Sequence, residues 1–205
     1  MRKRLAGLEE GRTVYADGAA RIESGAETLV VRPPFGLAHE GAYDRVELGP
    51  LLEALDADHV VAALLVRLGG YAVGIFEGER LVASKVGTRF VKGRHKKGGS
   101  SANRFRRRRE EQERALIDAA AETAARVLEP YRELIEHVAL GGDRAAVTRV
   151  LEQLPWLAGR TLPRFFDVPD PMQRVLERLP YELYAAELEE EPGPPREAAD
   201  PEKRS

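Results

Sequence analysis

The sequence predicts an α/β fold in which a mixed β-sheet is flanked by helices. Three apolar runs follow one another between residues 60 and 85, which is typical of an antiparallel meander. A long helical pattern begins at Asn103, and a strand, a Gly-Gly-Asp turn and a helix follow it between residues 134 and 154. Because a strand–turn–helix unit usually lies in a partly parallel sheet, we expect parallel and antiparallel pairing together.

The composition is that of a folded chain without disulfides. With 205 residues, 43% of them hydrophobic, the chain can bury a core, and it has no cysteine. The four histidines, His39, His59, His95 and His137, show no metal-ligand spacing, so we expect no metal and no cofactor. The longest apolar run is too short to cross a bilayer, and the first residues lack the apolar segment of a signal peptide. We therefore expect a cytoplasmic protein with no membrane partner.

Short elements are expected before residue 60. A helix is predicted from Gly49, because Pro50 stands near its first position, where proline is favoured. Short extended segments are expected at Arg12–Tyr15, Ala20–Glu23, Thr28–Arg32 and Asp44–Leu48.

The next segments predict the centre of the fold. Val60–Leu68 is almost entirely apolar, which is typical of a buried central strand, and Tyr71–Phe76 and Arg80–Lys85 complete the meander. From Asn103 onward, apolar residues recur with helical spacing as far as Leu128, and Pro130 ends or kinks the helix.

Shorter elements are expected after the long helix. Leu134–Leu140 predicts a strand, and Asp143 can cap a helix that runs to Leu154. Residues 189–205 are charged and proline-rich and are expected to be disordered, which leaves one domain over residues 1–188, with the weakest pattern in residues 1–50. The remaining expected elements are a loop and short strand over Pro155–Phe166, a helix over Asp170–Leu179, and a strand or helix end over Glu182–Leu188.

Positive charge is concentrated in residues 85–109. This stretch holds eleven Lys or Arg and no Asp or Glu, whereas the whole chain has a formal charge of −2, so all other residues together carry −13. Such asymmetry favours a polyanion at the stretch and repels it elsewhere. A Gly-Gly-Ser-Ser turn at residues 98–101 can present backbone N–H groups to phosphate. A surface loop with a serine cap explains the same turn equally well.

Arginines dominate the start of the long helix. Arg104 and Arg106–Arg109 oppose the helix macrodipole, at about 0.3–1 kcal/mol for each badly placed charge. We interpret this cost as the mark of a nucleic-acid-binding surface, although a solvated face is the alternative. Because Arg106–Arg109 cover every side of one turn, some of them should contact acids of the protein. Glu110, Glu111 and Glu113 are the candidates.

Three other residues of the basic region have two interpretations each. Phe90 and Phe105 can stack on bases or pack in the core. His95 can act as a general acid or base, or it can contact phosphate.

Several of these segments resemble the Vms-like release-factor family, which is related to the catalytic domain of the eukaryotic and archaeal class-one peptide release factor. The segments are Thr88-Arg-Phe-Val-Lys, Lys96-Lys-Gly-Gly-Ser-Ser, and Asn103-Arg-Phe with the arginines after it. Gly141-Gly-Asp and Asp167-Val-Pro-Asp-Pro are similar to the actinobacterial branch. The resemblance covers roughly residues 60–180. It implies an RNase H-like core and action on peptidyl-tRNA in the large subunit of stalled ribosomes, as part of ribosome quality control.

The resemblance also implies site residues. The catalytic loop tip would be Gly98, Gly99, Ser100, Ser101 and Ala102. The RNA-binding residues would be Lys92, Arg94, His95, Lys96, Lys97, Asn103, Arg104, Arg106, Arg107 and Arg108.

The chain departs from the family at one position. The family loop carries Gly-x-x-Gln, but Gly99-Ser-Ser is followed here by Ala102, and Gln112 lies too far along the helix to replace it. The glutamine could have been replaced artificially, the chain could be a natural member that binds without hydrolysis, or the side chain could be dispensable. We expect a peptidyl-tRNA hydrolase whose activity Ala102 impairs. The alternatives are an endonuclease that cuts the tRNA 3′ end and a non-catalytic ribosome- or rRNA-binding module.

Overall fold

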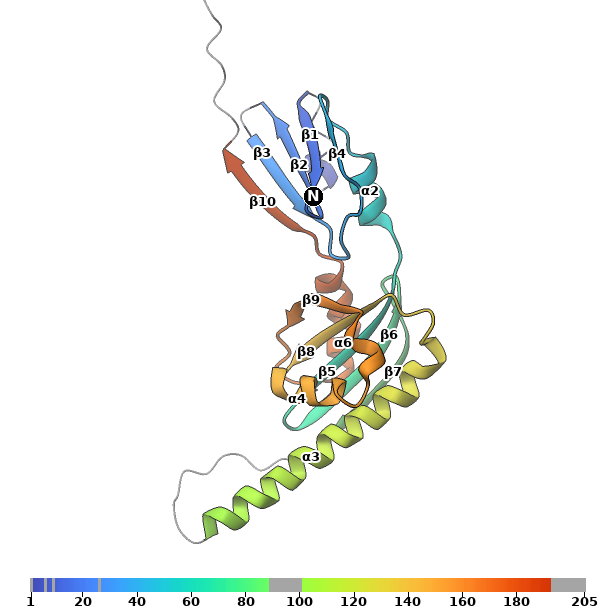
Figure 1. Cartoon of the computed structure of the whole chain (residues 1–205), viewed down its shortest axis with the longest axis vertical. Helices are drawn as coiled ribbons and strands as arrows, with labels where there is room; N and C mark the ends of the chain where they lie inside the picture. The colour runs from blue at the N-terminus through green and yellow to red at the C-terminus, as the bar shows by residue number, and fades with distance from the viewer. Residues whose placement is uncertain (1, 6, 9, 26, 89–100, 193–205) are drawn as a thin grey trace, which may run out of the picture. The chain divides into compact units, whose positions relative to one another are not determined.

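The structure, a computed structural model, describes residues 2–5, 7, 8, 10–25, 27–88 and 101–192. The chain forms two compact units (Figure 1). Unit one comprises Met1–Ala57 and Tyr184–Ser205, and unit two comprises Asp58–Leu183. This division differs from the expected single domain over residues 1–188, because the chain leaves unit one after Ala57 and returns to it at Tyr184.

Unit one is built on a five-stranded antiparallel sheet with the order β10-β3-β2-β1-β4. Its strands bury one apolar row, in which Ile22, Leu29 and Val31 have at most 1% of their surface exposed. Tyr15 and Leu51 belong to the same core. The elements are α1 (Arg2–Leu5), β1 (Arg12–Ala16), β2 (Ala19–Ser24), β3 (Glu27–Arg32), β4 (Gly41–Tyr43), α2 (Gly49–Asp56) and β10 (Glu187–Pro192).

One expected strand of unit one lies elsewhere. The strand that pairs with β1 is Gly41–Tyr43. The next segment, Asp44–Leu48, which the sequence predicted to be extended, is not part of the sheet. Two side-chain hydrogen bonds hold this segment. The Tyr15 hydroxyl donates to the carbonyl of Glu47 at 2.6 Å, and the Glu47 N–H donates to Thr13 Oγ1 at 3.0 Å.

The first residues of the expected disordered tail form strand β10. Glu187–Pro192 pairs antiparallel with β3, from Glu187 opposite Arg32 to Pro192 opposite Glu27. The acidic side chains that suggested disorder are paired, since Arg21 contacts Glu191 at 2.8 Å and Arg4 forms an ion pair with Glu190. The rest of the predicted tail, residues 193–205, lies outside the described residues.

Unit two contains the predicted mixed sheet, with the order β7-β6-β5-β8-β9. β5, β6 and β7 form the expected antiparallel meander, while β8 and β9 continue the sheet in parallel from β5. This is the strand arrangement of the RNase H-like core that the family resemblance implied. The elements are β5 (Val60–Arg67), β6 (Gly70–Glu77), β7 (Arg80–Thr88), α3 (Ser101–Leu128), η1 (Glu129–Tyr131), β8 (His137–Gly142), α4 (Arg144–Leu151), α5 (Pro155–Ala158), β9 (Thr161–Phe166) and α6 (Gln173–Leu183).

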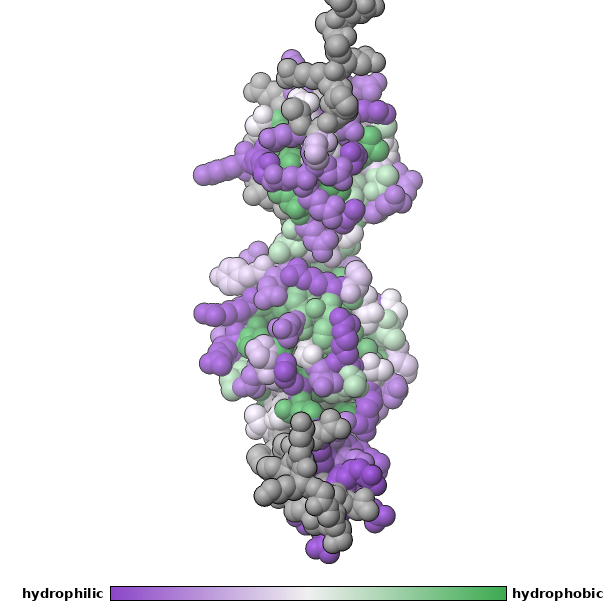
Figure 2. Space-filling view, turned by 90° about the vertical axis from the view of Figure 1, so that its left-hand side faces the viewer, coloured by the Kyte–Doolittle hydropathy of each residue, from purple (hydrophilic) through white to green (hydrophobic). Residues whose placement is uncertain are grey.

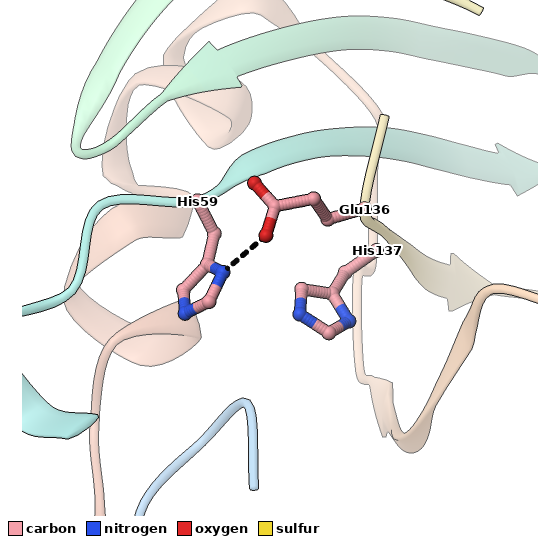
Figure 3. A group of neighbouring side chains, drawn as sticks. All are labelled: His59, Glu136 and His137. Atoms are coloured by element: carbon pink, nitrogen blue, oxygen red, sulfur yellow. Dashed lines mark hydrogen bonds and ion pairs between the residues drawn. The ribbon is translucent and has the colours of Figure 1, made fainter. Parts of the chain in front are cut away.

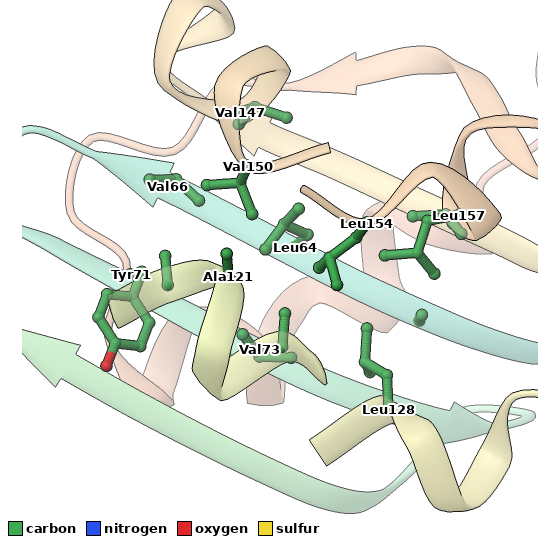
Figure 4. Close-up of a cluster of buried hydrophobic side chains, with 14 of the residues drawn as sticks. Leu64, Val66, Tyr71, Val73, Ala121, Leu128, Val147, Val150, Leu154 and Leu157 are labelled. Atoms are coloured by element: carbon green, nitrogen blue, oxygen red, sulfur yellow. The ribbon is translucent and has the colours of Figure 1, made fainter. Parts of the chain in front are cut away.

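Helices cover both faces of this sheet. On one face, Leu64 and Val73 pack with Ala121 of α3 and Val150 of α4, as Figure 4 shows. On the other face, α6 comes so close to β6 that a Cβ on Gly74 would lie 3.3 Å from Leu176. Burial on both faces explains why the central strand has an uninterrupted apolar sequence.

Two elements of unit two begin or end later than the sequence predicts. β8 begins at His137 because η1 precedes it and the carbonyl of Tyr131 accepts hydrogen bonds from the N–H groups of Leu134 and Ile135. α6 continues past Leu179 to Leu183 even though Pro180 lies inside it.

Gly142 offers a test of the turn between β8 and α4. Its φ is +99°, and a Cβ would clash with the carbonyl oxygen of Val66, which accepts the N–H of Asp143 at 2.7 Å. Gly142→Ala should therefore destabilise unit two by at least about 2 kcal/mol, combining roughly 1–2 kcal/mol for the left-handed backbone with about 1–3 kcal/mol for the steric displacement. Urea unfolding of the full chain, followed by the fluorescence of Trp156, the single tryptophan, reports on this unit.

Gly159→Ala is the matched control. Gly159 has a φ of −73°, and apart from its own chain neighbours no described heavy atom lies within 4 Å of the position that a Cβ would take, so alanine fits without strain. The control should leave the free energy of unfolding unchanged or raise it by about 0.4–1 kcal/mol. Equal effects of the two substitutions would contradict the role given to Gly142.

Candidate functional site

The first half of α3 projects beyond the sheet of unit two (Figure 1). Among its described side chains, buried residues begin at Leu116, and the part before them carries the arginines. The described atoms at this end of the unit are coloured hydrophilic in Figure 2. Half of one helix therefore belongs to the core, and the other half is available for contact with a ligand.

One face of this exposed half is strongly basic. Arg104, Arg107, Arg108 and Glu111 are spaced as neighbours on one side of a helix, and they line one shallow hollow. In the described part of the chain, no carboxylate lies within the 4.0 Å of an ion pair with Arg104, Arg107 or Arg108. We call Arg104, Arg107 and Arg108 the arginine face.

Two of the acids near this region, Glu110 and Glu113, pair with other arginines. Arg106 lies 3.8 Å from Glu110 one turn later, which agrees with the expectation that part of the arginine run contacts protein acids. Glu113 accepts a hydrogen bond from Arg149 of α4 at 2.8 Å, and this contact joins α3 to α4 where the core begins. Among the described residues, only Glu111 shares the hollow with the three arginines, so the hollow keeps a net positive charge.

The predicted catalytic tip falls largely outside the described residues. This holds for Gly98, Gly99 and Ser100, and for the predicted RNA contacts Lys92, Arg94, His95, Lys96 and Lys97. Ser101, Ala102 and Asn103 form the first residues of α3, which begins two residues earlier than the sequence predicted. The first turn of α3 contains no acidic residue. Its leading N–H groups and the arginines thus combine at one helix end, which is suited to anionic ligands.

A second group of polar side chains lies where β5 and β8, two neighbouring strands inside the unit two sheet, begin (Figure 3). His59 precedes β5, and Glu136 and His137 stand at the start of β8. His59 Nδ1 lies 2.8 Å from Glu136 Oε2, and the Val60 N–H donates to Glu136 Oε1 at 3.0 Å. The two imidazole rings meet edge to face, with their centroids 5.0 Å apart. We call these three residues the His–Glu–His cluster.

The surroundings of the cluster shift two of its pKa values. Burial lowers the pKa of His137, and the nearby His59 lowers it further, while Glu136 acts in the opposite direction. Burial alone would raise the pKa of Glu136, but the hydrogen bonds from His59 and from the Val60 N–H outweigh it, so this pKa lies below its ordinary value.

Sequence reasoning missed this cluster because it looked for ligands close together along the chain. His59 and Glu136 are 77 positions apart, and the parallel pairing of Val61 with His137 brings them together. One pattern in the sequence could have indicated it. His59 comes directly before a segment that is predicted to be a strand, and Glu136 lies near the start of another segment that is predicted to be a strand of the same sheet.

Comparison with known proteins identifies relatives of unit two. Residues 59–189 match the family model described as acVLRF1, the Actinobacteria/chloroflexi VLRF1 release factor. None of the curated protein sequences is significantly similar to this chain.

Three solved structures are among those that resemble the chain. The archaeal translation termination factor aRF1 is 17% identical with a TM-score of 0.48, and the match covers 81% of this chain and 49% of that one. Archaeoglobus fulgidus Pelota is 13% identical with a TM-score of 0.35, covering 88% and 60% of the two chains. The Vms1 mitochondrial localization core is 14% identical with a TM-score of 0.34, covering 91% and 79%. The matched region thus spans about half the length of aRF1.

Among the described residues, every helix is too short or too polar to cross a membrane.

The arginine face makes a measurable electrostatic prediction. Replacing Arg104, Arg107 and Arg108 together by glutamine should weaken the binding of duplex RNA, because each neutralised phosphate contributes through counterion release. The slope of log K against log salt should become less steep by up to about 0.9 for each lost contact. Fluorescence anisotropy across a salt series measures both quantities.

A matched control removes three exposed arginines elsewhere in unit two, Arg126, Arg174 and Arg178. This variant has the same net charge as the first one, so a general charge effect would weaken RNA binding equally in both. Equal loss would contradict a localised binding surface.

Proposed function

We propose that this chain, which belongs to the Actinobacteria/chloroflexi VLRF1 release-factor family, acts on peptidyl-tRNA in the large ribosomal subunit. Its reaction is hydrolysis of the ester between the nascent peptide and the terminal ribose, on ribosomes that have stalled. The observation that carries this proposal is the arginine face of α3, which follows the segment that the family resemblance assigns to the catalytic tip. A cationic surface joined to a glycine-rich tip suits the end of a tRNA.

The two parts of this region have separate tasks. Arg104, Arg107 and Arg108 neutralise backbone phosphates of the tRNA and supply most of the affinity. Gly98 and Gly99 let the backbone approach the terminal ribose, because no Cβ stands in the way.

The chemical step needs a water molecule and a stabilised oxyanion. Water attacks the ester carbonyl carbon, and the carbonyl oxygen gains negative charge. The bond to the ribose oxygen then breaks, and that oxygen takes the proton that the water loses. The first N–H groups of an α-helix lack intrahelical acceptors, so those at the start of α3, near Ala102, can donate to the oxyanion. Ala102 offers no side-chain amide to position the water, and we expect slow hydrolysis for that reason.

A second candidate function is binding without catalysis. Ala102 favours it, because the residue keeps the backbone at the tip and removes the side chain that the family motif supplies. In this case the chain would occupy the ribosome through the arginine face and would leave the ester intact.

Ala102→Gln tests the catalytic proposal directly. The glutamine restores the amide of the family motif, and one well-placed polar contact in a transition state is worth about 10²–10³ in rate. We expect the release of peptide from purified ribosome–nascent chain complexes to accelerate by about that factor relative to the unaltered chain. Gel analysis of peptidyl-tRNA over time measures the rate.

Ala102→Met is the matched control, since methionine has a similar length and no amide, and its rate should stay at that of Ala102. The RNA product must keep an intact CCA end, whereas a shortened end would show the tRNA endonuclease instead. Ribosome binding with no release by either chain would support the non-catalytic module and exclude hydrolysis.

A further inference from the structure

The His–Glu–His cluster joins the starts of two neighbouring parallel strands of unit two. The ladder begins beside it, because the Glu136 N–H donates to the carbonyl of Val60 at 2.9 Å. From there Val61 pairs with His137, and β5 and β8 run on in parallel. The cluster therefore stands on backbone that two well-formed strands fix in place.

The chemistry of the three side chains is that of a metal ligand set. Two imidazole rings and one carboxylate form the group, and one ligand atom from each lies within 4.8 Å of the other two. Imidazole nitrogen and carboxylate oxygen are common ligands of Zn²⁺ in proteins. Two histidines with one glutamate form one of the known catalytic zinc sites. The fourth position of such a site holds water.

We propose that His59, Glu136 and His137 bind a divalent transition-metal ion of the zinc type. This inference goes beyond the action on peptidyl-tRNA and does not depend on it. The ion would take the place of the hydrogen that His59 Nδ1 now donates to Glu136 Oε2, and the neutral imidazole would carry its ring proton on Nε2 instead.

The distances allow this exchange with small movements. Ligand atoms around a tetrahedral zinc are about 3.3 Å apart, given metal–ligand bonds of roughly 2.0–2.2 Å. His59 and Glu136 already approach more closely than that, at 2.8 Å, so they would separate slightly to admit the ion. The remaining ligand separations, at most 4.8 Å, would close by side-chain rotation.

The outer contacts of the cluster support one carboxylate orientation. Glu136 Oε1 accepts the Val60 N–H at 3.0 Å, which turns Oε2 toward His59. Such hydrogen bonds to the second carboxylate oxygen are typical of metal-ligating acids. The Glu136 side chain is 48% exposed and that of His59 is 19% exposed, so an ion and its water can enter from solvent.

The bound ion would link the starts of two neighbouring strands, β5 and β8. It would connect residue 59, the second residue of unit two, to the start of β8, and so would strengthen the parallel pairing where β5 begins. An open fourth position would leave one water on the metal.

Zinc titration of the metal-free, tag-free full chain tests the proposal. Competition with a chromogenic chelator should give one equivalent of Zn²⁺ per chain, and Co²⁺ should give the intense visible absorption of a tetrahedral site. His59→Ala and His137→Ala should each weaken Zn²⁺ binding by more than about 100-fold, the upper end of the loss seen on mutating outer contacts of metal ligands. Glu136→Gln, which keeps the size and the acceptor for Val60, should weaken binding by at least about tenfold.

The other two histidines supply matched controls. His39 lies 2.9 Å from the Tyr43 hydroxyl in unit one, and His95 lies in the basic stretch. His39→Ala and His95→Ala should retain the Zn²⁺ affinity and the Co²⁺ spectrum of the unaltered chain. Circular dichroism of each metal-free variant establishes that it is folded.

Three results would overturn the proposal. The first is an unaltered chain that binds Zn²⁺ no more tightly than a folded variant lacking both His59 and His137. The second is a loss of affinity in His39→Ala as large as that in His137→Ala. The third is unchanged binding in Glu136→Gln, which would remove the carboxylate from the ligand set.

Discussion

The pairing of β5 with its two neighbours is the constraint on which the rest of unit two depends. β5 pairs antiparallel with β6 on one side and parallel with β8 on the other. Its residues from Val61 to Val66 have no exposed surface, so both faces must be covered by helices. α3 and α4 cover one face and α6 covers the other, and every candidate functional group of unit two is positioned by one of these elements or by a strand end.

α3 separates its two roles along its own length. Its later part is rich in alanine, and Ala120, Ala121 and Ala124 are buried, which lets the helix lie close to the sheet. Its earlier part has no sheet beneath it and carries the arginine face. The ion pair between Glu113 and Arg149 of α4 lies at the change from one part to the other. The buried part of α3 thereby holds the charged part in place, although the charged part adds nothing to the core.

The elements with strong local signals could be predicted from the sequence. The apolar run of β5 and the Gly-Gly-Asp segment at the end of β8 are predictable because burial and backbone geometry restrict these residues directly. The arginines of α3 could be predicted for a different reason, because charge is visible in the sequence without a structure. Contacts that depend on topology could not be predicted. The meeting of His59 with Glu136 needs the parallel register of β5 and β8, and β10 needs arginines of unit one to offset its glutamates.

The position of β10 has a consequence for the order in which the chain folds during synthesis. Unit two is continuous in sequence, so all of its strands and helices are available once Leu183 has been added. Unit one begins earlier, but its edge strand, Glu187–Pro192, follows unit two in the sequence and is made only after it. Until then β3 presents an open edge with unpaired backbone groups. The nascent chain therefore completes its second unit before its first.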